Sequence, residues 1–178
     1  MPLSLQQLKG KHFDGPGGIR EMVIIALPMV ISHACETAMT FTDRLFLSRL
    51  SPDHMSASMG GGLSAFVMMT FFFGLIGYST ALVAQYLGSG QRHNCARTLS
   101  QTVIIAILAY PVILIAKPLA LAYFEWMDVP PVQLSLQKEY FNIIIYGLIF
   151  GLLRHCFSSY FSGLGKTRIV MMAAMVAM

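Results

Sequence analysis

Two carboxylate side chains, Glu36 and Asp43, lie inside a stretch of sequence that is otherwise apolar enough to cross a membrane, residues 19–47. The other acids fall in or beside predicted loops: Asp14, Glu21, Asp53, Glu125, Asp128 and Glu139. An ionisable side chain is costly at bilayer depth, so a carboxylate retained there is a candidate for binding a proton or an ion. We therefore look for function first at Glu36 and Asp43.

The two acids share one face of the helix that this stretch predicts. A helix turns by about 100° per residue, so Asp43 lies within about 20° of Glu36, two turns further on. Thr40 lies between them, about 40° from Glu36, and Ser32 continues the polar line one turn earlier. A poorly solvated carboxylate on this face can hold a proton or needs a cation partner. The alternative is a protonated acid that makes a static hydrogen bond to another helix.

The composition places the chain in a membrane. It is 56% hydrophobic and 11% charged, with a mean hydropathy of +0.65, which is too apolar for the surface of a soluble domain of this size. A spanning helix needs about 20 mostly apolar residues. Four segments reach that length: residues 21–50, 55–87, 95–124 and 139–162. We therefore expect an all-α, polytopic membrane protein.

A fifth helix is predicted to begin at Arg168, and it reaches only about half of a bilayer by Met178. A helix that stops at this depth leaves carbonyl groups unsatisfied in hydrocarbon. We therefore expect the chain to be a piece of a longer membrane protein. Residues 1–18 would form a polar cytoplasmic leader, and residues 19–178 would form part of one transmembrane domain.

Basic residues predict the orientation in the membrane. The net charge of +4 is spread over helix ends without a Lys/Arg block, so nucleic acid is not expected as a partner. A cytoplasmic amino terminus would leave three basic residues on the outer side: Arg49, Lys117 and Lys138. It would place most of them inside: Lys9, Lys11, Arg20, Arg92, Arg97, Lys166 and Arg168. The positive-inside rule therefore predicts a multi-pass protein of the inner (plasma) membrane with a cytoplasmic amino terminus. Arg154 lies deeper, and we expect its guanidinium to snorkel toward the headgroups, with contact to a substrate as the alternative.

Prolines and glycines predict local features of the spans. Pro28 removes a backbone donor from the first span, which predicts either a static kink or a moving hinge. Pro111 and Pro118 are expected to interrupt the third span. Gly147 and Gly151 have the spacing of a helix-contact motif, so we expect another helix to pack there. Close packing is also expected at the glycines of the second span: Gly60, Gly61, Gly62, Gly74 and Gly77.

No motif of an enzyme is complete in this sequence. The string at residues 163–167, GLGKT, is similar to a phosphate-binding loop, but Tyr160 stands where that motif needs glycine. A membrane aspartyl protease would need two embedded aspartates, and only Asp43 qualifies. The cysteines lack the spacing of a metal or redox site: Cys35, Cys95 and Cys156. We therefore expect neither enzymatic activity nor a cofactor.

Four segments, in this order along the chain, carry a family resemblance. They are ALPMV at residues 26–30, AMTFTDRLFLSRL at 38–50, ALVAQYLGSGQ at 81–91 and SSYFSGLGKTR at 158–168. The sequence resembles the multidrug and toxic compound extrusion (MATE) family of secondary transporters. The resemblance covers nearly all of the chain after Ile19 and leaves out the polar leader.

The resemblance implies a transporter of twelve spanning helices in two six-helix lobes. Such a protein exports organic cations and other amphiphiles across the lipid bilayer in exchange for protons or sodium ions. This chain would supply four helices and the start of a fifth in the amino-terminal lobe. The family's coupling aspartate falls on Asp43, a sodium or proton site, and its helix-bending proline falls on Pro28. Glu36 and Thr40 come from helical geometry alone.

In the family pattern, further ligands of that ion site come from helices five and six. This sequence stops at Met178, before those positions, so a complete ion site is not expected from it. We therefore expect the chain without the remainder of the transporter to be inactive. Two alternatives stay open. One is a lipid-precursor flippase of the same superfamily, and the other is a membrane subunit or remnant that does not transport.

Overall fold

The computed structural model describes residues 18–127 and 129–177, and all of its regular structure is helical. Its elements are α2 (Ile19–Leu50), α3 (Pro52–Gly77), α4 (Ser79–Gly88), α5 (Arg92–Trp126), α6 (Pro131–Gly163) and α7 (Thr167–Ala177). Four stretches are long and apolar enough to cross a membrane: α2, α3 with α4, α5 and α6. The shorter α7 is also apolar. The predictions of an all-α fold and of four spans followed by a shorter helix are confirmed. The leader, apart from Gly18, lies outside the described residues.

Local sequence signals explain where the helices begin and end. Ser51 precedes α3, and its hydroxyl oxygen accepts a hydrogen bond from the backbone N–H of His54 at 3.3 Å. Pro52 follows in the first helical position, where its missing N–H costs nothing. The turn after α4 uses Gly90 with φ 76°, and the turn after α6 uses Gly165 with φ 71°. Both values lie in the left-handed region that favours glycine.

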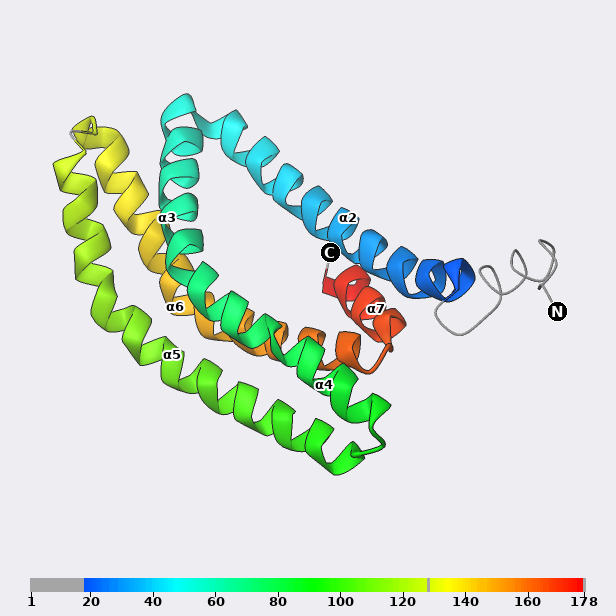
Figure 1. The fold of residues 1–178 in the computed structure, drawn as a ribbon. Coiled ribbons are helices and arrows are strands. Elements are labelled where there is room, and N and C mark those ends of the chain that lie inside the picture. The colour runs from blue at the N-terminus through cyan, green and yellow to red at the C-terminus, as the bar shows by residue number, and fades with distance from the viewer. Residues whose placement is uncertain (1–17, 128, 178) are drawn as a thin grey trace, which may run out of the picture.

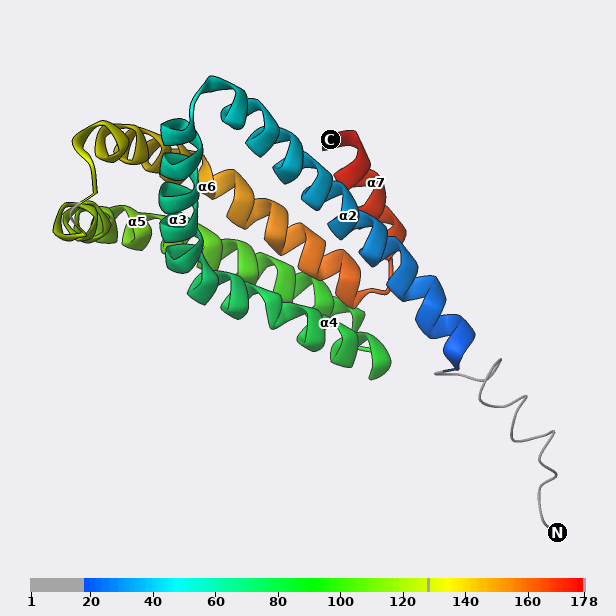
Figure 2. The same ribbon diagram turned by 90° about the horizontal axis from the view of Figure 1, so that it is seen from above.

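The connections alternate between two ends of the molecule. The α2–α3 and α5–α6 connections lie at one end in both views (Figures 1 and 2). The start of α2, the α4–α5 turn and the α6–α7 turn lie at the other (Figures 1 and 2). This is the arrangement expected for successive antiparallel spans. It gathers Arg20, Arg92 and Lys166 at the same end of the bundle.

The core is formed by α3, α5 and α6, and α2 lies beside it. Phe124 of α5 and Phe141 of α6 are fully buried and meet edge to face, with ring centroids 5.3 Å apart. By contrast, Pro28 and Ser32 are the buried residues of α2. The backbone of α2 packs against α7 and against α3, its neighbour in sequence. The structure therefore combines a packed three-helix core with a peripheral helix that carries the two acids.

Close helix packing occurs at some of the predicted glycines and not at others. A Cβ atom added at Gly61 would lie 3.0 Å from the backbone oxygen of Gln137 on α6. One added at Gly163 would lie 2.7 Å from the backbone oxygen of Thr80 on α4. A Cβ at Gly147 or Gly151 would meet nothing within 4 Å in the described residues. The expectation that Gly147 and Gly151 form a helix contact is therefore wrong within this part of the chain.

Three features of the spans differ from the expectation. The second span is divided at Tyr78 into α3 and α4, in a segment where glycines let the helix bend. Pro111 and Pro118 do not interrupt α5, which runs through both of them, because neighbouring groups in a membrane helix can compensate for a missing N–H. The fourth span begins eight residues earlier than predicted, at Pro131, which is a favourable first position for a helix.

Replacing Gly163 by alanine tests the close approach of α4 and α6. The new methyl group would overlap the Thr80 carbonyl and the Val83 side chain, so we expect a loss of about 1–3 kcal/mol of stability. Gly147→Ala is the matched control, because open space surrounds Gly147 and alanine favours a helix by up to about 1 kcal/mol. Thermal unfolding in detergent measures both. Equal melting temperatures for the two variants would contradict the packing described here.

Candidate functional site

Glu36 lies at bilayer depth for any placement of α2 in a membrane. A span uses about 20 residues, and α2 has 32. Every segment of that length within Ile19–Leu50 contains residues 31–38, and therefore contains Glu36. Asp43 lies two turns closer to the α2–α3 turn, on the same face. Glu36 thus lies inside the span in each of these placements, at a depth that depends on the placement.

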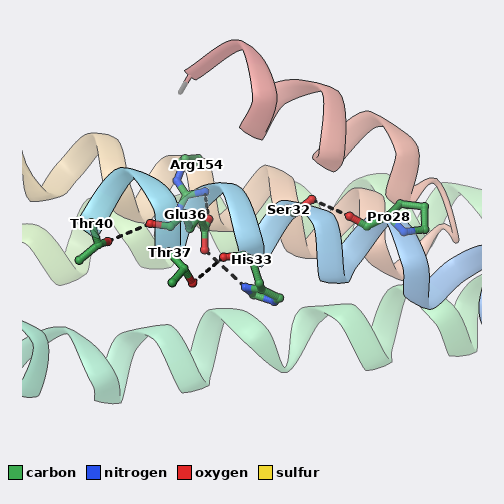
Figure 3. A network of polar contacts seen from close by, with 7 residues as sticks. All are labelled: Pro28, Ser32, His33, Glu36, Thr37, Thr40 and Arg154. Carbon is green, nitrogen blue, oxygen red and sulfur yellow. Dashed lines mark hydrogen bonds and ion pairs between the residues drawn. The ribbon is translucent and has the colours of Figure 1, made fainter. Parts of the chain in front are cut away.

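The carboxylate of Glu36 is paired with two basic side chains, as Figure 3 shows. Arg154 of α6 donates from Nη1 to Oε1 at 2.6 Å. The Nδ1 atom of His33, one turn earlier on α2, lies 3.4 Å from Oε2. The side chains of Arg154 and Glu36 are 60% and 40% exposed. The sequence predicted that the Arg154 guanidinium snorkels toward the headgroups. In the structure it contacts the Glu36 carboxylate on another helix, which neutralises its charge.

The ion pair spans a gap between two helices. The backbones of α2 and α6 do not pack against each other among the described residues, so the two long side chains bridge the distance between them. In the described structure from Pro28 to Leu50, Glu36 is the α2 residue that makes a hydrogen bond or ion pair with another helix. The middle of α2 is therefore linked to α6 by charge and not by close packing.

The hydroxyl groups on the acidic face are bonded to their own helix. Ser32 donates to the carbonyl of Pro28 at 2.9 Å, and Thr40 donates to the carbonyl of Glu36 at 2.9 Å (Figure 3). Each hydroxyl oxygen keeps lone pairs that can accept a proton or contact a cation. The predicted polar face is present, but these groups do not converge on one point.

Asp43 differs from Glu36 in having no partner. Its side chain is exposed, and it makes no hydrogen bond or ion pair with the described residues. A hollow of about 410 Å³ beside Glu36 is lined by His33, Glu36, Thr37, Thr40, Phe41 and Arg44. The structure therefore brings Glu36 and Thr40 together in this hollow and leaves Asp43 beyond its edge.

Two basic groups of this site, His33 and Arg154, were not assigned to it from the sequence. Arg154 is separated from Glu36 by 118 residues, and no local pattern pairs them. His155 follows directly, and its ring stacks on Phe73 of α3 with centroids 4.6 Å apart. Its Nε2 atom lies 3.2 Å from the Phe73 carbonyl oxygen. The one signal available was the adjacent pair of basic residues inside a span.

The described residues contain no group of three or more His, Cys, Asp or Glu side chains placed to hold a metal ion. The arrangement can still bind charge in two ways. Asp43 offers a free carboxylate that can take up a proton or contribute to a cation site. Glu36 is already occupied by Arg154 and His33, so a proton or a cation there would compete with them.

The fold and these charges define a multi-spanning α-helical membrane protein with ionisable groups on one face of a span. The sequence model of the MatE family matches residues 28–178. The chain belongs to the MatE family, and the resemblance inferred from the sequence is confirmed.

Relatives with curated names agree with this assignment. The multidrug resistance protein PmpM of Pseudomonas aeruginosa is 27% identical over 158 residues, covering 84% of this chain and 32% of the relative. A probable multidrug resistance protein NorM of Synechococcus is 24% identical over 155 residues, covering 86% of this chain and 33% of the relative. A NorM of Mesorhizobium japonicum is 34% identical over 85 residues, covering 48% and 18%. The chain thus spans about a third of the length of the first two relatives. No solved structure matches it.

A double-mutant cycle tests the pair of Glu36 and Arg154. Glu36→Gln or Arg154→Met alone leaves one charge without a partner at a depth where a charge costs about 2.5–3.5 kcal/mol. The double variant removes both charges, so its loss of stability should be smaller than the sum of the single losses, by about 1 kcal/mol or more. Unfolding in bicelles measures all of these variants.

The matched control is the pair of Glu125 and Lys138, which has the same 2.6 Å separation. It joins the end of α5 to the start of α6 and lies near the membrane surface, where such pairs contribute about 0–1 kcal/mol. Additive losses at Glu36 and Arg154, as at the control pair, would contradict an ion pair at bilayer depth.

Proposed function

We propose that the protein containing this chain is a secondary active multidrug transporter. It exports organic cations and other amphiphiles in exchange for protons or sodium ions that flow inward. Membership of the MatE family and the names of the related multidrug resistance proteins support this proposal. The family consists of transporters, so no catalytic chemistry is assigned to the chain.

The observation that carries the proposal is the free carboxylate of Asp43 on a membrane-spanning helix. Glu36, on the same face, is neutralised by Arg154, whereas Asp43 makes no ion pair in the described structure. A carboxylate retained on a membrane-spanning helix is a candidate for binding a proton or a cation. Asp43 is therefore the residue to which we assign coupling. Thr40 lies one turn earlier on α2, where its hydroxyl donates to the Glu36 carbonyl and keeps lone pairs for an ion.

Coupling requires that the ion binds two conformations with different affinity, since a ligand shifts an equilibrium only by that difference. In this account, uptake of the ion at Asp43 favours one orientation of the transporter and substrate binding favours the other. Pro28 supplies the place where α2 bends, because it lacks a backbone donor inside the helix. A proton needs one oxygen of Asp43. A sodium ion needs several oxygen ligands, which other parts of the protein would have to add.

The orientation follows from charge. The end of the bundle that holds Arg20, Arg92 and Lys166 is proposed to face the cytoplasm, in agreement with the positive-inside rule. We place the protein in the plasma membrane, the inner membrane of a bacterium with two membranes. Its substrates reach it from the cytoplasm or the bilayer.

Replacing Asp43 by asparagine tests this function. The experiment uses everted membrane vesicles that contain the complete open reading frame around this sequence, and it follows efflux of a fluorescent organic cation driven by a proton or sodium gradient. Asp43→Asn should abolish gradient-driven transport and retain substrate binding, because the amide cannot take up a proton or carry the charge that attracts a cation.

Asp53→Asn is the matched control, since Asp53 lies exposed in the first turn of α3, near the membrane surface. It should transport like the unmodified protein at equal expression. Unchanged coupled transport in Asp43→Asn would contradict the role of Asp43. Absence of transport by the unmodified protein would favour the subunit or remnant, and transport of a labelled lipid precursor in its place would favour the flippase.

A further inference from the structure

We propose that Arg154 is the positioning residue for the acidic face of α2. Its guanidinium holds the middle of α2 at a fixed distance from α6 through Glu36, and so determines where Asp43 lies. The importance of the position of Asp43 for ion coupling rests on the proposed function. The distance between α2 and α6 can be measured without that function.

The ion pair of Glu36 and Arg154 lies inside the span. Glu36 lies within every possible span of α2, and the 2.6 Å contact brings Arg154 to the same depth. Charges at that depth interact strongly, because little water screens them. Separating them leaves each in an environment that disfavours it. The pair therefore resists opening more than an ion pair at the surface does.

α2 packs against α7 and α3, and among the described residues its backbone makes no contact with α6. The hydroxyl groups beside Glu36 bond to their own helix. The pair of Glu36 and Arg154 is therefore the direct link between the middle of α2 and α6 in the described structure, so loss of the Arg154 charge should widen the range of distances between these two helices.

Arg154 lies on a part of α6 that is packed into the core. Leu152 and Cys156, on either side of it along α6, are fully buried in the core. His155 binds the Phe73 carbonyl of α3 on another side of the same turn. Packed helices in such a core do not move independently. Arg154 therefore transmits the position of the core to α2, and Asp43 follows because it lies two turns along the same helix.

The experiment measures the distance between α2 and α6 in the complete protein in lipid nanodiscs. Spin labels are placed at Met39 of α2 and Ile143 of α6, both exposed side chains, after the native cysteines have been replaced. Pulsed electron paramagnetic resonance reports the distribution of distances. Arg154→Met should broaden the distribution and shift it to longer distances. The exchanged pair, Glu36→Arg with Arg154→Glu, should restore the narrow distribution.

Lys138→Met is the matched control, because it breaks the other 2.6 Å ion pair of α6 away from α2; it should leave the distribution unchanged. An unchanged distribution in Arg154→Met would overturn the proposal, even if the melting temperature falls, because the arginine would then stabilise without positioning. Failure of the exchanged pair to restore the distribution would overturn it too. Transport is not needed for this readout, so an active Asp43→Asn variant would refute the proposed function and leave the positioning role intact.

Discussion

A charged side chain in the middle of a bilayer must be neutralised or turned away from lipid, and this constraint organises the chain around α2. Glu36 meets it by pairing with Arg154, at 2.6 Å, and with His33. Asp43 instead carries an exposed carboxylate that makes no ion pair with the described residues. The difference between the two acids is chemically useful. A paired carboxylate fixes a helix in place, whereas an unpaired one remains able to take up an ion.

The ion pair links α2 to a core that the other helices form by close packing. Phe124, Phe141 and their neighbours join α3, α5 and α6 into a core, and close contact at Gly61 and Gly163 removes the freedom of those helices to slide. The peripheral α2 shares little of that packing. A protein that alternates between two conformations needs elements that keep their shape and elements that shift. The core has the packing of the first kind, and the proposed function assigns the second role to α2, which lies beside that core.

The sequence predicted the features that depend on local chemistry. Hydropathy located the spans, and helical arithmetic placed Glu36 and Asp43 on one face. It could not predict contacts between distant segments. Arg154 carries no local sign that its partner is Glu36, and the spacing of Gly147 and Gly151 says nothing about which side of α6 has a neighbour. The prediction that Pro111 and Pro118 interrupt a span was wrong. Proline disrupts an isolated helix in water, but inside a membrane bundle neighbouring groups compensate for its missing N–H.

The central claim is that the acidic face of α2 is turned away from lipid. It is tested most directly by measuring how often a spin label on α2 collides with oxygen, which dissolves in hydrocarbon, and with a nickel chelate, which stays in water. A label at Thr40 on the acidic face should collide with oxygen much less often than labels on the opposite face do. Labels at Ala34 and Leu45 on the opposite face should collide mainly with oxygen. High oxygen collision at Thr40, equal to that at Leu45, would contradict the account.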